Sequence, residues 1–423
     1  MTAGCYPSRV QSLPDSPYAA ARLGIVLVLM MMGASGMYGV SVVLPAVQAD
    51  FGVARADASM PYAFLMLGFG VGGLFMGRLA DRLGVMVPLL IGAVGMGAGF
   101  VLAGRASDIG TFNVVHGVLI GLFGCSATFA PLLADTTHWW VRRRGIAVAI
   151  CASGNYLGGA VWPPVIQHFV ETVGWRQTYI GMGVFCFVMM TALALTLRRR
   201  APRHSSLPPS ASSPAGETAD ATRAMPFGLT RLQATVMLCI AGFACCVAMS
   251  MPQVHIVAYC GDLGYGAARG AEMLAVMLGF GVVSRLVSGV ICDRIGGLRT
   301  LLLGSALQGV ALLLFLPFDG LVSLYVIAAL FGLFQGGIVP SYAIIVREHF
   351  PASETGGRVG AVIMMTMIGM SAGGWMSGRI FDLTGSYQAA FVNGLAWNVV
   401  NLTIVFFLLR RIGDRPLVPL ART

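Results

Sequence analysis

The sequence predicts an all-α membrane protein with twelve transmembrane helices in two six-helix halves that repeat each other. Composition is the first observation, since 57% of the residues are hydrophobic and only 10% are charged. The mean hydropathy of +0.80 is typical of a chain whose bulk lies in a bilayer. The other two observations are a series of apolar windows and an internal repeat.

The apolar windows fall six on each side of a polar segment, and each is long enough to cross a membrane. They cover residues 22–46, 58–80, 86–104, 111–134, 145–170, 177–197, 231–259, 268–291, 300–318, 320–346, 359–381 and 388–409. The polar segment, residues 198–230, has the arginine, serine and proline content of a disordered connector. We therefore expect an N-terminal bundle at 22–197, a C-terminal bundle at 231–409, and tails at 1–21 and 410–423.

The repeat is visible as a stretch that occurs twice. Residues 66–71 (MLGFGV) recur unchanged at 277–282, and residues 77–84 (GRLADRLG) recur as GVICDRIG at 289–296. A repeat of half the chain length is typical of transporters built from two related bundles. In such proteins the substrate binds between the bundles, near the middle of the membrane.

Arg285 interrupts the second copy, where the first copy has Gly73 or Leu74. It precedes Asp293 by two helical turns, so at about 1.5 Å per residue it lies about 12 Å into a hydrocarbon core about 30 Å thick. An arginine at that depth costs roughly 2.5 to 3.5 kcal/mol and usually faces a protein interior or a wet cavity. All acidic residues lie in tails, loops or helix ends. The partner of Arg285 is then a substrate anion or, in a structural role, backbone carbonyls and water.

The arginines also predict the orientation. All 27 basic residues are arginines, and only five of them lie in loops on one side: Arg55, Arg105, Arg176, Arg269 and Arg379. Apart from Arg285 the others lie on the other side, which the positive-inside rule makes cytoplasmic. We expect a multi-pass protein of the cell inner membrane with both termini and the 198–230 segment in the cytoplasm. The first span then serves as an uncleaved signal anchor. The net charge of +10 follows this pattern, so no nucleic-acid partner is expected.

Residues 77–84 (GRLADRLG) resemble the signature between the second and third helices of the major facilitator superfamily, and residues 289–299 resemble its second-half copy. The resemblance implies the major facilitator fold and a conformational latch. In that latch a glycine lets helices approach, while an acidic residue and an arginine hold the outward-open state. The latch residues are Gly77, Asp81, Arg82, Gly84, Gly289, Asp293, Arg294 and Gly296.

Three features resemble the monocarboxylate and oxalate/formate branch of that superfamily: residues 139–145 (WWVRRRG), residues 382–387 (DLTGSY) and Arg285. The resemblance implies that Arg285 holds the substrate carboxylate. The chain departs from the branch at Gly281, where proton-coupled carriers have an aspartate, and near Thr366, where oxalate exchangers have a lysine. A single cation at the midplane favours a monoanion over a dianion.

Other polar residues within the spans are further candidates for substrate binding: His255, Tyr259, Tyr38, Asn155 and Gln335. A histidine changes charge near neutral pH and suits proton traffic, but each of these side chains could instead join helices by hydrogen bonds. Residues 68–73 match GxGxxG without a preceding strand, so close helix packing explains them better. No catalytic, metal or cofactor motif is found. We expect neither an enzyme nor a bound metal or cofactor.

The sequence thus predicts a secondary active transporter of a small organic anion, in particular a monocarboxylate, that works by alternating access as a monomer in the lipid bilayer. The alternative is a drug or other small-molecule efflux carrier, which is disfavoured because cation sites use an intramembrane carboxylate. A transporter-like sensor or receptor is the alternative of another class, and it is disfavoured by the short tail at 410–423. The sequence leaves open whether transport is coupled to a co-transported proton, to an exchanged anion or to neither.

The orientation is testable with single cysteines. A cysteine at Ser212 should react with a membrane-impermeant label only from the cytoplasmic side, and one at Gly320 only from outside. Sealed right-side-out and inside-out vesicles provide the two conditions. The reverse labelling pattern would contradict the predicted orientation.

Overall fold

The computed structural model describes residues 15–199 and 226–413. Most of the predicted connector and parts of both predicted tails lie outside these residues. The described chain contains twelve helical segments long and apolar enough to cross a membrane. The prediction of an all-α protein with twelve spans is confirmed.

The N-terminal half contains the first six spans. Its helices are α1 (Pro17–Phe51), α2 (Arg55–Leu83), α3 (Met86–Gly104), α4 (Ile109–Val115), the π-helix η1 (His116–Cys125), α5 (Ala130–Trp139), α6 (Arg144–Val173) and α7 (Trp175–Thr196). The fourth span, which the hydropathy presents as one window, is thus divided into α4, η1 and α5.

The C-terminal half contains the other six spans. It consists of the 3-10 turn η2 (Pro226–Gly228), α9 (Arg231–Asp262), α10 (Ala267–Ile295), α11 (Gly297–Leu314), α12 (Leu321–Gln335), α13 (Ile338–His349), α14 (Ala352–Thr384) and α15 (Tyr387–Gly413). The tenth span is divided at Gly336 and Gly337, which matches the division of the fourth span in the other half.

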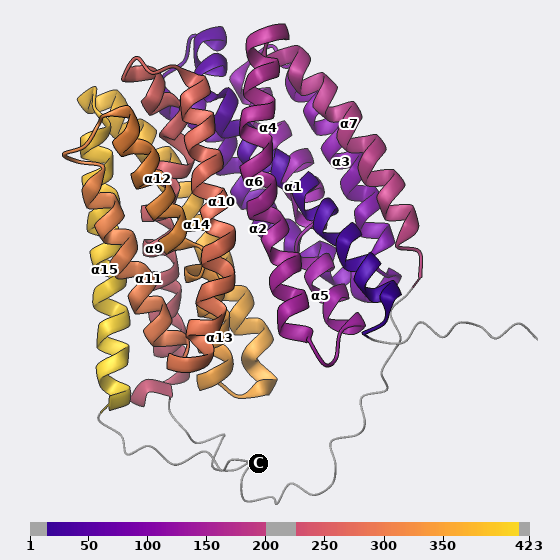
Figure 1. The fold of residues 1–423 in the computed structure, drawn as a ribbon, viewed down its shortest axis with the longest axis vertical. Helices are drawn as coiled ribbons and strands as arrows, with labels where there is room; N and C mark the ends of the chain where they lie inside the picture. The colour runs from indigo at the N-terminus through magenta and orange to yellow at the C-terminus, as the bar shows by residue number, and fades with distance from the viewer. Residues whose placement is uncertain (1–14, 200–225, 414–423) are drawn as a thin grey trace, which may run out of the picture.

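The two halves lie side by side, with α2 and α6 of the first near α10 and α14 of the second (Figure 1). We call the end where α7 stops and α9 begins the linker end, and the end that holds the α1–α2, α9–α10 and α14–α15 turns the opposite end. The linker end is at the bottom of Figure 1. Every position along the membrane normal can be described relative to these two ends.

The two repeat copies end their helices in the same way. Gly84 and Gly296, directly after α2 and α10, have φ angles of 86° and 83°, a region that glycine enters without steric cost. Their backbone N–H groups donate to the carbonyl oxygens of Ala80 and Cys292, each at 2.8 Å. The repeat in sequence is therefore also a repeat in structure.

Glycines allow equivalent helices to touch in the two halves. A Cβ added to Gly68 of α2 would lie 2.0 Å from the carbonyl oxygen of Gly117 in η1. In the other half, a Cβ added to Gly332 of α12 would lie 1.8 Å from the carbonyl oxygen of Met277 in α10. Small residues permit such backbone approach in membranes. The contact of Gly68 supports the packing explanation of the GxGxxG stretch.

A buried ion pair joins α1 to α5 inside the N-terminal half. Arg22 donates through Nε and Nη2 to the two carboxylate oxygens of Asp135, at 2.8 and 3.0 Å. The side chains are only 2% and 9% exposed, and the guanidinium carbon lies 4.8 Å from the centre of the Trp139 ring. This two-point geometry is the strong form of an arginine–carboxylate pair. It fixes the end of the divided fourth span.

We predict that two alanine substitutions in α2 differ in their effect on stability. Gly68→Ala should lower the thermal unfolding temperature, because the new methyl group would meet the Gly117 carbonyl and overpacking typically costs about 1–3 kcal/mol. Gly73→Ala is the matched control, since nothing lies within 4 Å of an added Cβ there. Purified variants in detergent would be compared by thermal unfolding. Equal stability of the two variants would contradict the packing role of Gly68.

Candidate functional site

Arg285 lies where α10 of the C-terminal half crosses α6 of the N-terminal half. Its Nη1 donates to the carbonyl oxygen of Ala152 at 3.0 Å, and its Nε donates to that of Gly336 at 3.4 Å. The guanidinium carbon lies 4.5 Å from the centre of the Tyr156 ring. Within the described chain no ion pair includes Arg285. Backbone carbonyls and an aromatic face are therefore its protein partners.

Glycines create the close crossing that brings Arg285 to α6. A Cβ added to Gly281, one helical turn before Arg285, would lie 2.5 Å from the Tyr156 ring. One added to Gly159 would lie 2.5 Å from Leu278 and 2.7 Å from the Tyr38 ring. The space next to Gly281 is thus filled by the tyrosine that also stacks on Arg285.

Tyr38 and Asn155 form a polar pair next to this crossing. The Tyr38 hydroxyl donates to Asn155 Oδ1 at 3.2 Å, and Tyr38 is only 4% exposed. Asn155 directly precedes Tyr156 in α6. The structure therefore brings two of the predicted candidates together near Arg285.

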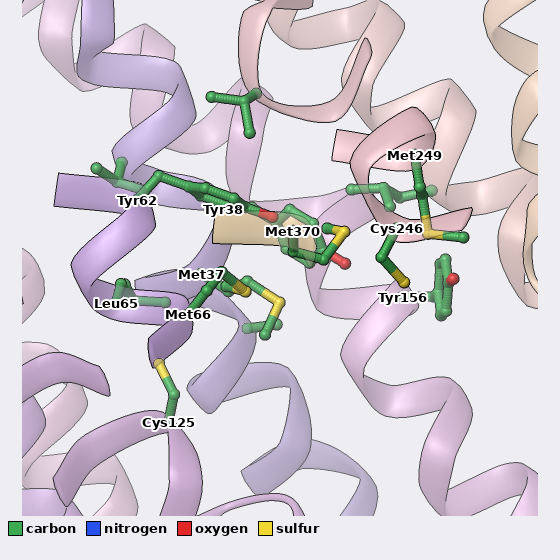
Figure 2. Close-up of a cluster of buried hydrophobic side chains, with 14 of the residues drawn as sticks. Met37, Tyr38, Tyr62, Leu65, Met66, Cys125, Tyr156, Cys246, Met249 and Met370 are labelled. Carbon is green, nitrogen blue, oxygen red and sulfur yellow. The ribbon is translucent and has the colours of Figure 1, made fainter. Parts of the chain in front are cut away.

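Tyr38 and Tyr156 belong to a cluster of buried hydrophobic side chains that both halves contribute (Figure 2). We call it the midplane cluster; its labelled members in Figure 2 are Met37, Tyr38, Tyr62, Leu65, Met66, Cys125, Tyr156, Cys246, Met249 and Met370. Methionine is flexible and polarizable, and it adapts to irregular apolar shapes. The arginine thus stands beside an environment of low polarity, where an electrostatic interaction is stronger than in water.

Gln335 lies beside the Arg285 contact but points to its own half. It is fully buried, and its side-chain oxygen accepts a hydrogen bond from Gln253 at 2.9 Å. The next residue is Gly336, whose carbonyl holds Arg285 Nε. Gln335 is thus connected to the site through the backbone.

The structure places His255 and Tyr259 near Tyr387, toward the opposite end, and does not bring them together with Arg285. The two ring nitrogens of His255 are hydrogen-bonded to the Tyr387 hydroxyl at 3.1 Å and to the Gly374 carbonyl at 2.8 Å. The Tyr259 ring packs against the rings of Tyr387 and Phe391, with centroids 5.5 and 5.6 Å away. These two candidates belong to a separate layer of the protein.

The latch residues all lie at the linker end. Asp81, Arg82, Asp293 and Arg294 are exposed, and within the part of the chain that the structure describes they form no ion pair. A Cβ added to Gly77 or to Gly289 would meet nothing within 4 Å. Among the described residues, neither a close helix contact at Gly77 or Gly289 nor an ion pair at the four charged latch residues is therefore present.

Arg55 is a functional candidate that the sequence does not distinguish from the other loop arginines. The structure buries it to 7% exposure at the start of α2, where it contacts Asp262 and Tyr387 of the other half. The sequence contains only a weak signal for these contacts, which is that Arg55, Asp262 and Tyr387 fall in or next to turns on the same side of the membrane.

Comparison with known proteins places this arrangement in a family. The family model for the Major Facilitator Superfamily matches residues 24–323 and 273–422. Monocarboxylate transporter 13 of Bos taurus is 28% identical over 337 residues, which cover 79% of this chain and 75% of that protein. The MFS-type transporter YcxA of Bacillus subtilis is 24% identical over 341 residues, covering 79% of this chain and 81% of that protein.

Solved structures share the fold at low sequence identity. A structure of the peptide transporter POT in complex with sulfate has a TM-score of 0.74 at 13% identity and covers 95% of this chain and 96% of that chain. A structure of the nucleoside transporter NupG has a TM-score of 0.71 at 12% identity and covers 93% and 99%. With its twelve spans, its repeated halves and a family match over most of its length, the chain belongs to the Major Facilitator Superfamily of membrane transporters.

Proposed function

We propose that this chain is a secondary active transporter of a small organic monoanion, in particular a monocarboxylate. The observation that carries the proposal is Arg285, a cation at the crossing of the two halves whose described partners are backbone carbonyls and the Tyr156 ring. The similarity to Monocarboxylate transporter 13 supports the same substrate class.

A carboxylate would improve on the present partners of Arg285. The guanidinium presents a planar set of donors that matches two carboxylate oxygens, and a charge-assisted pair is roughly twice as strong as a neutral hydrogen bond. Nη1 now donates to Ala152 across the two halves. Binding of an anion would replace this bond, so the substrate would act on the contact that fixes α10 against α6.

The rest of the site fits a monoanion with an apolar part. Tyr38 and Asn155 offer a hydroxyl and an amide for a second polar group of the substrate, and the midplane cluster offers apolar surface. The guanidinium of Arg285 contacts Tyr156, a member of the midplane cluster. Arg22 and Arg55 lie closer to the two ends of the protein, where each is paired with a carboxylate. We assign substrate binding to Arg285, Tyr38 and Asn155, with Gln335 as support.

We further propose an inner-membrane location with cytoplasmic termini, which makes the linker end cytoplasmic. The latch residues at that end would then engage when the transporter opens to the outside. Their exposure here agrees with a conformation in which the halves are joined at the opposite end instead.

The proposal predicts separable effects at Arg285. Arg285→Gln should nearly abolish carboxylate uptake while the protein stays folded, because it removes a cation that no described carboxylate offsets. Arg285→Lys keeps the charge but loses the planar fork, so it should bind substrate more weakly. Uptake into proteoliposomes and thermal shift with a panel of short carboxylates would measure both, since a ligand that binds the folded state raises its stability.

Arg22→Gln is the matched control for these variants. It strands Asp135 at a buried site, and removing half of a buried pair typically costs about 3–5 kcal/mol, so this variant should unfold more readily. A stable Arg285→Gln protein that still transports carboxylates at the normal rate would refute the proposed role. So would an Arg285→Gln protein as unstable as Arg22→Gln.

A further prediction concerns the pH dependence of uptake. His116, like His255, has both ring nitrogens engaged, by the Phe112 carbonyl at 2.8 Å and the Tyr179 hydroxyl at 3.3 Å. Since neither histidine contacts Arg285, we expect His116→Gln and His255→Gln to keep the wild-type dependence of uptake on pH. Uptake would be measured from pH 5 to 8. A pH dependence of uptake that is lost in either variant would contradict this expectation and would identify that histidine as the proton carrier.

A further inference from the structure

The N-terminus of α2 is capped by a residue of the other half. The backbone N–H groups of Arg55 and Ala56 donate to the two carboxylate oxygens of Asp382, each at 2.8 Å. Ala54, the residue in the N-cap position, provides no side-chain cap of its own. A helix N-terminus has unpaired N–H groups and favours a negative charge. Asp382, near the end of α14, meets both requirements from across the boundary between the halves.

The Arg55 side chain makes a second set of contacts with the same half. Its Nη2 donates to Asp262 at the end of α9 at 3.1 Å, and its Nη1 donates to the hydroxyl of Tyr387 at the start of α15 at 2.9 Å. The guanidinium carbon lies 4.6 Å from the centre of the Phe381 ring. A buried arginine requires such partners. All of them come from the C-terminal half, so Arg55 depends on the two halves being together.

A layer of hydrogen bonds supports these contacts from within the C-terminal half. The carbonyl of Gly374 can only accept, so His255 Nε2 carries the proton and donates to it. The neutral ring then leaves Nδ1 as an acceptor for the Tyr387 hydroxyl. That hydroxyl in turn accepts from Arg55. His255 therefore orients the hydroxyl of Tyr387 toward Arg55. This structural role explains why position 255 has a polar side chain.

The backbones also meet at this point. A Cβ added to Gly378 of α14 would lie 2.9 Å from both Ala56 Cα and the Arg55 carbonyl oxygen. One helical turn deeper, a Cβ added to Gly374 would lie 3.2 Å from the Tyr62 ring. At Gly378 the backbones of α2 and α14 are thus in direct contact, and this contact cannot persist if the halves separate at this end.

We propose that Arg55 and Asp382, with Asp262 and Tyr387, form an interhelical lock that holds the opposite end of the transporter closed and has to break in every transport cycle. The hydrogen bonds of this lock and the one from Arg285 to Ala152 join the two halves. The lock gives a role to the 382–387 turn. It concerns the position of the halves and does not rest on the identity of the substrate.

The lock is not duplicated by the internal repeat. By the offset that aligns residues 66–71 with 277–282, the counterpart of Arg55 is Gly266 at the start of α10. Arg55 is therefore a departure from the repeat, as Arg285 is. Loss of Arg55 cannot be compensated by an equivalent arginine at the same position of the other half.

Distance measurements between spin labels test the proposal on the full-length protein in lipid nanodiscs. One label pair, at the exposed Ser107 and Leu383, spans the opposite end, and the other, at Val141 and Arg347, spans the linker end. Labels on non-natural amino acids avoid the nine native cysteines.

We expect the wild-type protein to show mainly the short distance at the opposite end. Arg55→Gln and Asp382→Asn should each lower the ratio of short to long distances there by about tenfold or more, since each breaks a desolvated charged contact between the halves. The linker-end distances should shorten in parallel.

Two further variants control for charge. Arg269→Gln removes an arginine at the same end whose ion pair with Glu272 stays within α10, so it should leave the distances unchanged. The exchange Arg55→Asp with Asp262→Arg restores an ion pair and should recover part of the short-distance population. An unchanged distance distribution in both Arg55→Gln and Asp382→Asn, or an equal shift in Arg269→Gln, would overturn the proposal.

A steric variant tests the same closure without altering any charge, and it applies even if a charge variant fails to fold. Gly378→Leu should open the opposite end, because the side chain would occupy the space of Ala56. Gly181→Leu in α7 is the control, since nothing lies within 4 Å of a Cβ there. A short distance that persists in Gly378→Leu would show that α2 and α14 do not form the closing contact, and would overturn the proposal.

Discussion

The structure depends on one constraint: a charge or backbone polar group placed in a membrane has to find its partner within the protein. Three arginines meet this constraint in different ways. Arg22 has a carboxylate in its own half, Arg55 has carboxylates in the other half, and Arg285 has carbonyls from both. The first pairing stabilises one bundle. The other two tie the bundles to each other, so the pairing of charges depends on how the halves are placed.

These pairings also depend on glycine. Glycine residues at the helix crossings allow particular helices to approach closely enough for the pairs to form. Gly68 and Gly332 bring equivalent helices together within the two halves. Gly281 makes room for the ring that covers Arg285, and Gly378 makes room for the start of α2. The first pair builds the bundles, and the second pair builds the two layers of contact between them.

The positions at which the two halves agree in sequence differ in role from the positions at which they do not. Where the halves agree, as at Gly84 and Gly296, they share a helix end and a local backbone conformation. Among the positions where they differ are two arginines that connect the halves: Arg285 from the C-terminal half, at the crossing with α6, and Arg55 from the N-terminal half, at the opposite end. A common fold is thus combined with an asymmetric distribution of charge.

The sequence by itself determined the twelve spans, the repeat and the superfamily, because hydropathy and short motifs are properties of continuous segments. It also indicated that Arg285 lacks a nearby carboxylate in its own span. Only the tertiary structure decided that Asp382 caps α2 and that His255 faces Tyr387. The capping residues are 327 positions apart in the chain, and the pair Arg22 and Asp135 is 113 apart. Several arginines and carboxylates occur in turns at each end of the protein. The local sequence around them does not indicate which arginine pairs with which carboxylate. The close packing of particular helices selects the pairs.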